Sequence, residues 1–250
     1  KEDLLSHNGL WFSFDHYTKY SDPDAGVALR RINQDFELAK RKLQKSDLLI
    51  LTPGTSFVYE HRQTGRIVSN CHKIPAREFS RYMLDVDRVV ELFSGLVERI
   101  ISLRPGARIL FTVSPVRHLK DGFSENQHSK SVLLLATREL VGNYPDTCYY
   151  FPSYEIMMDD LRDYRFYDTD LLHPGETAVD YIWEKFRDSV ISGESRMIIG
   201  KLEKILKAIS HKPIHSNTDA HHSFVENTRQ TIRKLKTQFP FLQWDNMPDL

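Results

Sequence analysis

Helical and continuous apolar patterns alternate along the first part of the chain. Apolar residues recur at helical spacing over residues Ala28–Leu43, Phe79–Ile101 and Asn126–Leu140. Each helical pattern is followed by a short, largely apolar run, and these runs are Leu48–Thr52, Ile109–Val113 and Cys148–Phe151. We interpret the runs as buried strands, because a strand covered on both faces needs no polar alternation. The alternation predicts an α/β fold, with a parallel sheet and helices on both faces.

A long connection follows the first predicted strand. Residues Phe57–His61 and Arg66–Ser69 predict a hairpin that turns at Gln63–Gly65 and carries Asn70–Lys73 toward the edge of the sheet. A connection of this length between a strand and its helix is more often functional than accidental. Covering an exposed sheet edge is an equal alternative for it.

The pattern changes after residue 192. Two helical stripes of apolar residues, Ile198–Ile209 and Phe224–Phe239, are separated by Pro213 and predict a helical hairpin. We therefore expect an α/β domain over residues 1–192 and a helical appendage over residues 193–250.

The appendage is rich in basic residues and histidines. The lysines and arginines on its outer faces are typical of a solvated surface. Histidines gather in residues 211–217 and at His221 and His222. We interpret this stretch as a loop with exposed imidazoles rather than as a metal site.

Composition narrows the classes of function. The 250 residues are 40% hydrophobic and 27% charged, which allows a sizeable core and argues against a disordered chain. Lys plus Arg and Asp plus Glu balance at 34 each, so no net field attracts nucleic acid or an anionic membrane. No apolar run approaches the roughly 20 residues that span a bilayer. We expect no nucleic acid partner, no membrane partner and no cofactor. The composition leaves open whether the protein forms an oligomer.

The cysteines indicate neither a disulfide framework nor a metal centre. Cys71 and Cys148 are too few for such a framework, which favours a reducing cytoplasm. Cys71 and His72 with His118 or His128 form only a weak metal set, because no acidic or second cysteine partner stands at zinc-like spacing. We therefore predict no metal.

An acid and an imidazole stand three residues apart in Asp170-Leu171-Leu172-His173-Pro174. In a tight loop or one helical turn such residues lie side by side, so Asp170 can accept a hydrogen bond from Nδ1 of His173. Nε2 then remains free to deprotonate a hydroxyl nucleophile. The same spacing also occurs in capping arrangements without catalytic role, and both interpretations are open on these residues alone.

Polar residues follow the predicted strands at Gly54–Ser56 and Ser114–His118. The carboxyl ends of parallel strands share one edge, where the ligands of such sheets bind. The positive or titratable donors near this edge are His72, Lys73, Arg117 and His118. They indicate an anionic or polyhydroxylated substrate. For Arg117, a bidentate contact with a carboxylate or phosphate and a salt bridge within its own loop are equal alternatives.

Four blocks of sequence occur in a fixed order with helical patterns between them. The blocks are Leu51–Tyr59, Asn70–Pro75, Val113–His118 and Asp170–Pro174. Together they resemble the GSCFA-domain proteins, which belong to the SGNH/GDSL-like hydrolases, and the resemblance covers about residues 1–245. It implies a flavodoxin-like, three-layer fold and a serine hydrolase site.

The resemblance also implies roles for single residues. His173 is the expected general base, Asp170 its partner, and Gly54 a backbone donor to the oxyanion that forms when an ester carbonyl is attacked. Ser56 stands where the asparagine donor of SGNH-type sites is expected. Asn70 is our candidate replacement for that donor, with a turn residue closing the hairpin as an equal alternative.

The Gly-Ser-Cys-Phe-Ala block, which supplies the serine of the family, does not occur in this sequence. We expect that block and the first strand of the sheet upstream of Lys1, because a sheet without this strand would expose an unpaired edge. Alternatively the segment is lost, and a partner chain or the aromatic arm Trp11–Phe14 covers the edge. Ser56 or Ser114 as an internal nucleophile is a weaker alternative.

The sequence thus predicts an esterase-type serine hydrolase, or an acyl transferase, for a small oxygen ester of anionic or carbohydrate-like character. The alternative function is a non-catalytic binding module that retains the hydrolase fold.

Overall fold

The computed structural model describes residues 4–210, 218–242 and 244. The chain divides into two compact units, Lys1–Ile182 and Trp183–Leu250. The division falls inside a helix that ends at Val190, whereas the sequence predicts a boundary after residue 192.

The protein belongs to the mixed α/β class, as predicted. The strands are β1 (Leu5–His7), β2 (Leu10–Phe12), β3 (Leu48–Leu51), β4 (Phe57–His61), β5 (Arg66–Val68), β6 (Phe79–Met83), β7 (Arg108–Phe111) and β8 (Cys148–Tyr150). The α-helices are α1 (Ala25–Lys45), α2 (Val86–Leu103), α3 (Gly122–Asn143), α4 (Ser153–Glu155), α5 (Glu176–Val190), α6 (Gly193–Ser210) and α7 (Asp219–Gln238). Short 3₁₀ helices are η1 (Thr18–Tyr20), η2 (Ala76–Glu78), η3 (Leu119–Asp121) and η5 (Tyr164–Phe166), and η4 (Ile156–Asp160) is a π-helical turn.

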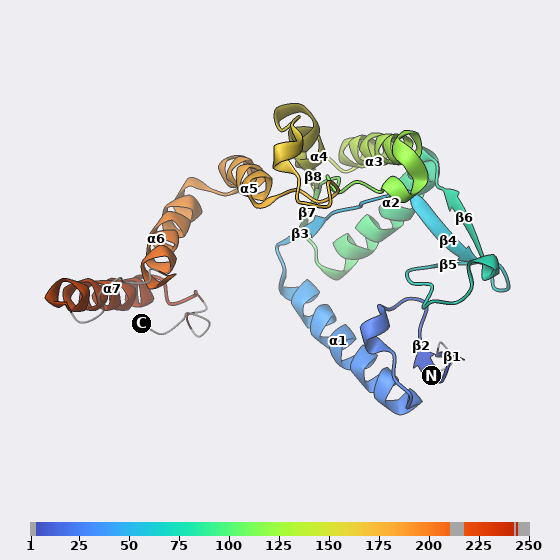
Figure 1. Ribbon diagram of the computed structural model, residues 1–250, viewed down its shortest axis with the longest axis horizontal. Coiled ribbons are helices and arrows are strands. Elements are labelled where there is room, and N and C mark those ends of the chain that lie inside the picture. Colours follow the sequence, from blue (N-terminus) through green and yellow to red (C-terminus); the bar gives the residue numbers. More distant parts are fainter. Residues whose placement is uncertain (1–3, 211–217, 243, 245–250) are drawn as a thin grey trace. The chain divides into compact units, whose positions relative to one another are not determined.

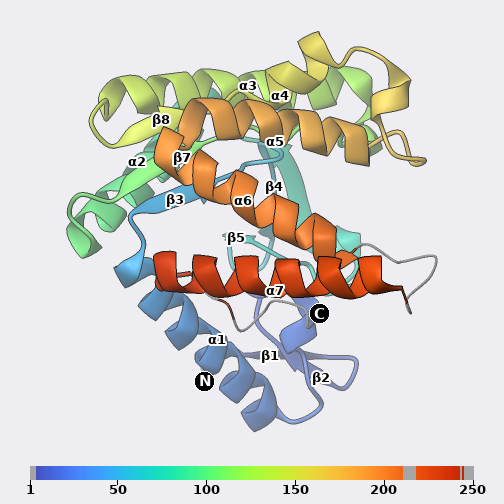
Figure 2. The same cartoon turned by 90° about the vertical axis from the view of Figure 1, so that its left-hand side faces the viewer.

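A parallel sheet in the order β3-β7-β8 carries the main core of the first unit (Figure 1). Ile109 on the central strand pairs with Leu49 on one side and Cys148 on the other. Helices α2 and α3 pack against each other, and α3 lies beside β8 in both views (Figure 1 and Figure 2). Buried residues of these elements form one cluster, which includes Val97, Ile100, Phe111, Leu133 and Leu140. The predicted parallel strands with intervening helices are confirmed.

Strand β3 is less buried than predicted. It is the end strand of its sheet within the described residues, and Leu48 and Ile50 are 43% and 51% exposed. On the central strand β7, in contrast, Ile109 and Phe111 are completely buried. A continuous apolar run predicted burial on both faces. Burial also requires neighbouring strands, and among the described residues β3 has such a neighbour, β7, on only one side.

A second sheet, in the antiparallel order β5-β4-β6, contains the predicted hairpin and one strand that we did not predict. Residues Phe79–Met83 fit a helical pattern in the sequence, but they form β6 and pair with β4. Their spacing of four residues fits a period of two as well as a helical period. Helix α2 begins only at Val86, where the Asp85 carboxylate accepts a hydrogen bond from the Arg88 amide at 2.8 Å.

The aromatic arm near the amino terminus packs on the second sheet. It forms the β1-β2 hairpin, and Phe12 and Phe14 are buried against Val68 and Phe79. The arm is therefore part of that small core, and it does not serve as the cover of the β3 edge that we considered from the sequence.

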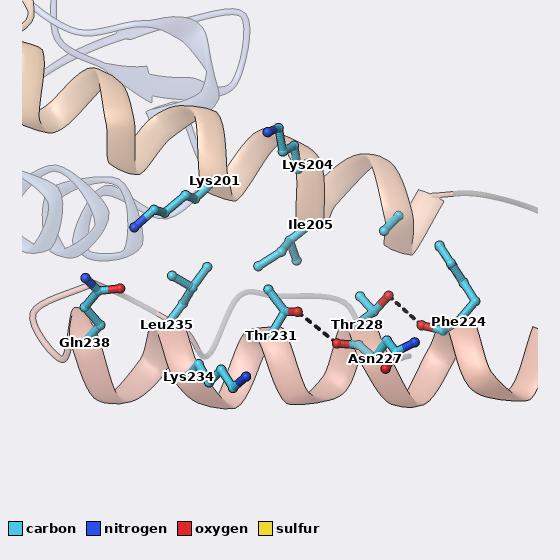
Figure 3. A pocket seen from close by; sticks show the side chains of 11 residues that line it. Lys201, Lys204, Ile205, Phe224, Asn227, Thr228, Thr231, Lys234, Leu235 and Gln238 are labelled. Atoms are coloured by element: carbon cyan, nitrogen blue, oxygen red, sulfur yellow. Dashed lines mark hydrogen bonds between the residues drawn. The ribbon is translucent and has the colours of Figure 1, made fainter.

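The second unit contains the two predicted carboxyl-terminal helices, α6 and α7. Ile205 and Leu235 are buried and line a cavity of about 550 Å³ between these helices (Figure 3). Lys201, Lys204 and Lys234 also line this cavity. In the described parts of the chain, no helix combines the length and the apolar character needed to cross a bilayer.

Candidate active site

The Asp170–His173 pair forms as its spacing predicts. Oδ2 of Asp170 lies 2.6 Å from Nδ1 of His173. Its other oxygen, Oδ1, accepts hydrogen bonds from the backbone amides of Leu172 at 2.8 Å and His173 at 3.0 Å. Leu171 has a φ of +58°, and this left-handed residue turns the chain back toward Asp170. The carboxylate therefore closes the turn and orients the imidazole at the same time.

Hydrogen bonding keeps Asp170 ionised. The amide of His173, then its imidazole, and then the amide of Leu172 lower the pKa of Asp170 to about 2. An ionised carboxylate can only accept, so Nδ1 of His173 carries the shared proton and Nε2 of the neutral ring holds a lone pair. Nε2 has no hydrogen-bond partner among the described residues, and the ring is exposed. This is the tautomer that a general base requires.

Two backbone hydrogen bonds hold the loop that carries this pair. The amide of Asp168 donates to the carbonyl of His173 at 2.8 Å, and the amide of Arg117 donates to the carbonyl of Leu172 at 3.2 Å. The second bond joins the loop to the segment that follows β7. The pair therefore lies at the carboxyl end of the parallel sheet, as we predicted from the strand order.

The segments after β3 and β7 meet at Gly54. A Cβ atom added to Gly54 would lie 3.2 Å from Nε2 of His118 and 3.8 Å from Cβ of Ser114. The amide of His118 donates to Oδ1 of Asn126 at 2.8 Å, which holds this loop on α3. Glycine at position 54 thus lets the imidazole of His118 approach the backbone closely.

Lys130 is a part of this region that we did not identify from the sequence. It is only 1% exposed, and its ammonium donates to the carbonyls of Gly54 and Ser114, both at 2.6 Å. Burial lowers the pKa of Lys130 to about 8. Burial, followed by the charge of Lys130, also lowers the pKa of His118. The available signal was a lysine three residues before Leu133 on the buried face of a predicted helix.

The two serines considered as internal nucleophiles have different surroundings. Ser56 is 2% exposed, and its amide and hydroxyl contact Oγ of Ser129 at 2.7 and 3.1 Å. Its hydroxyl is therefore inside the protein, away from any solvent-borne ester. Ser114 is half-buried, and its Oγ accepts a hydrogen bond from the amide of Val116 at 3.3 Å.

The residues delivered by the hairpin contact the amino-terminal arm. Oδ1 of Asn70 accepts from the amide of His72 at 2.8 Å, which is the turn geometry we considered as its alternative role. The ring of His72 lies 4.4 Å from that of Phe12, and its Nε2 is 2.8 Å from the carbonyl oxygen of Ser13. Lys73 is exposed and adopts a φ of +61°. The contacts of Asn70 and His72 thus brace the arm on the second sheet.

Arg117 is held by aromatic rings. Its guanidinium carbon lies 4.1 Å from the ring centroid of Tyr167 and 5.4 Å from that of Tyr164. Within the described residues no carboxylate pairs with it, so the salt bridge that we considered from the sequence is not formed. Arg117 instead lines a cavity of about 410 Å³.

The described residues contain no cluster of side chains suited to bind a metal ion. Across residues 4–210, 218–242 and 244, no group of three or more His, Cys, Asp or Glu side chains is arranged to hold a metal ion. Cys71 and Cys148 are free thiols. The exposed ring of His128 lies 3.5 Å from Glu125. The predicted histidine-rich loop over residues 211–217 lies outside the described residues.

Comparison with protein families gives two matches. The GSCFA family matches residues 1–186, and the C-terminal domain of GSCFA domain proteins matches residues 202–247. No curated protein and no solved structure matches the chain. The first match covers well over half of the chain and includes Gly54, Ser114, Arg117 and the Asp170–His173 pair. The chain therefore belongs to the GSCFA family.

Proposed function

We propose that this protein is an esterase-type hydrolase, or an acyl transferase, for a small oxygen ester. The 2.6 Å contact between Asp170 and Nδ1 of His173, with Nε2 free of any partner among the described residues, is the observation that supports this proposal. Nε2 takes the proton from a hydroxyl nucleophile as it attacks the ester carbonyl. The same nitrogen then returns the proton to the departing alkoxide.

Gly54 is the proposed backbone donor to the oxyanion. The peptide that carries its N–H is held at its other end, where the Pro53 carbonyl accepts a hydrogen bond from the Ser114 amide at 3.0 Å, and the ring of His118 packs against the Cα side of Gly54. A peptide held from both sides does not need to reorganise as negative charge develops, and this preorganisation is what stabilises the transition state.

The superfamily, the layer arrangement and the location belong to the same proposal. We place the chain among the SGNH/GDSL-like hydrolases with a flavodoxin-like, three-layer fold. The parallel order β3-β7-β8 and the loops at the strand ends support this placement. The free thiols of Cys71 and Cys148 support a cytoplasmic location.

The nucleophile is proposed to be the serine of the Gly-Ser-Cys-Phe-Ala block, which this sequence does not contain. The buried hydroxyl of Ser56 is unsuited to the role. Because no described serine is hydrogen-bonded to Nε2 of His173, a binding module without catalysis is the second candidate function.

Turnover of p-nitrophenyl acetate by a longer chain that includes the serine block tests the proposal. We expect His173→Ala and Asp170→Asn each to lower kcat/KM by about a hundredfold or more, because the base or its tautomer is lost. His128→Ala is the matched control, since His128 is also exposed and stands three residues from an acidic partner, Glu125. It should retain wild-type turnover.

The same assay separates the two candidate functions. Equal turnover by the wild-type and His173→Ala proteins would remove His173 from the mechanism. A longer chain that turns over no ester would favour the binding module.

A further inference from the structure

A cavity of about 410 Å³ adjoins the candidate active site, and the proposed chemistry does not use it. Its lining includes the polar residues Arg117, Asn126 and Gln127 and the apolar or aromatic residues Leu119, Met158 and Tyr164. Two of these residues also belong to the framework of the site. The amide of Arg117 bonds to the loop of His173 through Leu172, and Asn126 holds His118.

The guanidinium of Arg117 has the geometry of an anion-binding group. Its central carbon lies over the ring of Tyr167 at 4.1 Å, and its N–H groups, which can bind an anion bidentately, have no acceptor among the described residues. Arg117 is half-buried, and no described residue supplies a carboxylate to it. A charge in this position is best satisfied by an anionic group that enters the cavity.

Two side-chain amides add neutral donors. Oδ1 of Asn126 is used by the His118 amide, and Oε1 of Gln127 accepts from the Tyr154 hydroxyl at 2.8 Å. Because the oxygens are engaged, the amino groups are the free ends of both side chains. Neither amino group has an acceptor among the described residues, and no acidic side chain lines the cavity. Among these polar residues of the lining, the free groups are therefore donors.

We propose that this cavity is a substrate subsite that binds a carboxylate group of the ester through a bidentate contact with Arg117. This inference rests on the proposed esterase function. Arg117 carries the one formal charge of the lining. Nearby Lys130 already donates to two carbonyls. With a single available positive charge, the site matches a monoanion better than a dianionic phosphate. The apolar residues of the lining suit a short aliphatic chain. The substrate class is an ester whose acyl or alcohol part ends in a carboxylate.

Binding of hexanoate and of its neutral analogue hexanamide to the whole chain tests the subsite directly. Calorimetric titration should show hexanoate binding and an affinity for hexanamide that is lower by about tenfold or more. Arg117→Gln should lose the preference for hexanoate. Arg165→Gln is the matched control, because Arg165 also stacks on a ring, that of Phe166 at 4.8 Å, but does not line the cavity.

A second variant keeps the test valid if Arg117→Gln fails to fold. Gln127→Glu retains the acceptor for the Tyr154 hydroxyl and adds a negative charge to the lining. It should abolish hexanoate binding. Equal binding of hexanoate and hexanamide by the wild-type protein, or unchanged hexanoate binding by Gln127→Glu, would overturn the subsite. Tighter binding of inorganic phosphate than of hexanoate would overturn its assignment to a carboxylate.

Ester kinetics separate failure of the subsite from failure of the function. In the longer chain, the ratio of kcat/KM for mono-p-nitrophenyl glutarate to that for p-nitrophenyl acetate should fall about tenfold in Arg117→Gln. An unchanged ratio would reject the subsite while the esterase function stands. Hexanoate binding that depends on Arg117, without turnover of any ester, would reject the function while the subsite stands.

Discussion

At the scale of single residues, the site depends on buried polar groups that join separate loops. Lys130 donates to Gly54 and Ser114, and Asn126 holds His118. These contacts set the backbone around the proposed oxyanion donor, yet none of the joining residues belongs to the reacting pair. Lys130 places a charge inside the protein, and burying a charge is unfavourable. The free energy of unfolding should therefore depend on pH.

We predict that the wild-type protein gains stability relative to Lys130→Met between pH 8 and pH 10. The native pKa of Lys130 is about 8, below its ordinary value of 10.5, so in this range the unfolded chain binds more protons than the native one. Stability then rises with pH, by at most about 1.4 kcal/mol per pH unit. Urea unfolding at both pH values measures the difference.

Lys40→Met, which replaces an exposed lysine of α1, is the control and should show no such change. A difference between wild type and Lys130→Met that is the same at both pH values would contradict the buried-charge explanation. The loss of donors to two carbonyls lowers the stability of Lys130→Met at every pH, so only the slope is diagnostic.

At the scale of elements, the loop that carries His173 packs closely against the backbone of Tyr167. A Cβ atom on Gly175 would lie 3.2 Å from the carbonyl oxygen of Tyr167, which is itself part of a β-bridge to Pro174. Backbone atoms in a bridge cannot move aside as a flexible side chain can. The absence of a side chain at position 175 therefore allows the loop to close.

We predict that Gly175→Ala destabilises the protein by about 1–2 kcal/mol, because it overpacks this bridge. Gly95→Ala in α2 should instead stabilise it by about 0.5–1 kcal/mol, since no heavy atom from outside the local helix backbone lies within 4 Å of the added methyl group. Urea unfolding of both variants measures these values. Equal stability of the two variants would contradict this prediction, because it would show that the bridge shifts to accommodate the methyl group at little cost.

The elements also show where reasoning from sequence succeeds. The β4-β5 hairpin and the Asp170–His173 turn were predicted, because each depends on residues a few positions apart. Strand β6 was not predicted. Its spacing fits two periods, and pairing with β4 rather than any local preference makes it a strand.

At the scale of the whole molecule, surface charge and exposed apolar residues act together. Basic and acidic residues balance at 34 each, so the protein has little net charge to oppose self-association. Strand β3 ends its sheet within the described residues, and Ile50 on it is half exposed. For the 250-residue chain by itself, an apolar end strand on a nearly neutral protein favours association between copies.

We predict that Ile50→Lys reduces concentration-dependent association at pH 7, because a lysine on an end strand opposes edge pairing. Sedimentation velocity over a range of concentrations measures the effect. Leu103→Lys makes the same change of charge at a residue of α2 that is 61% exposed, and it should have a smaller effect. Identical sedimentation of wild type and Ile50→Lys would exclude the β3 edge as the associating surface.

The amino-acid sequence alone determined the alternation of helices and strands, the position of the predicted site at the strand ends and the pairing of Asp170 with His173. Periodicity and short-range hydrogen bonds decide these features, and both can be read along the chain. Only the tertiary structure decided that Lys130 bonds to Gly54, 76 residues away, that buried Ser56 contacts Ser129, and that no carboxylate of the described residues pairs with Arg117. Such contacts depend on which helix faces meet which loops, and no local pattern encodes that choice.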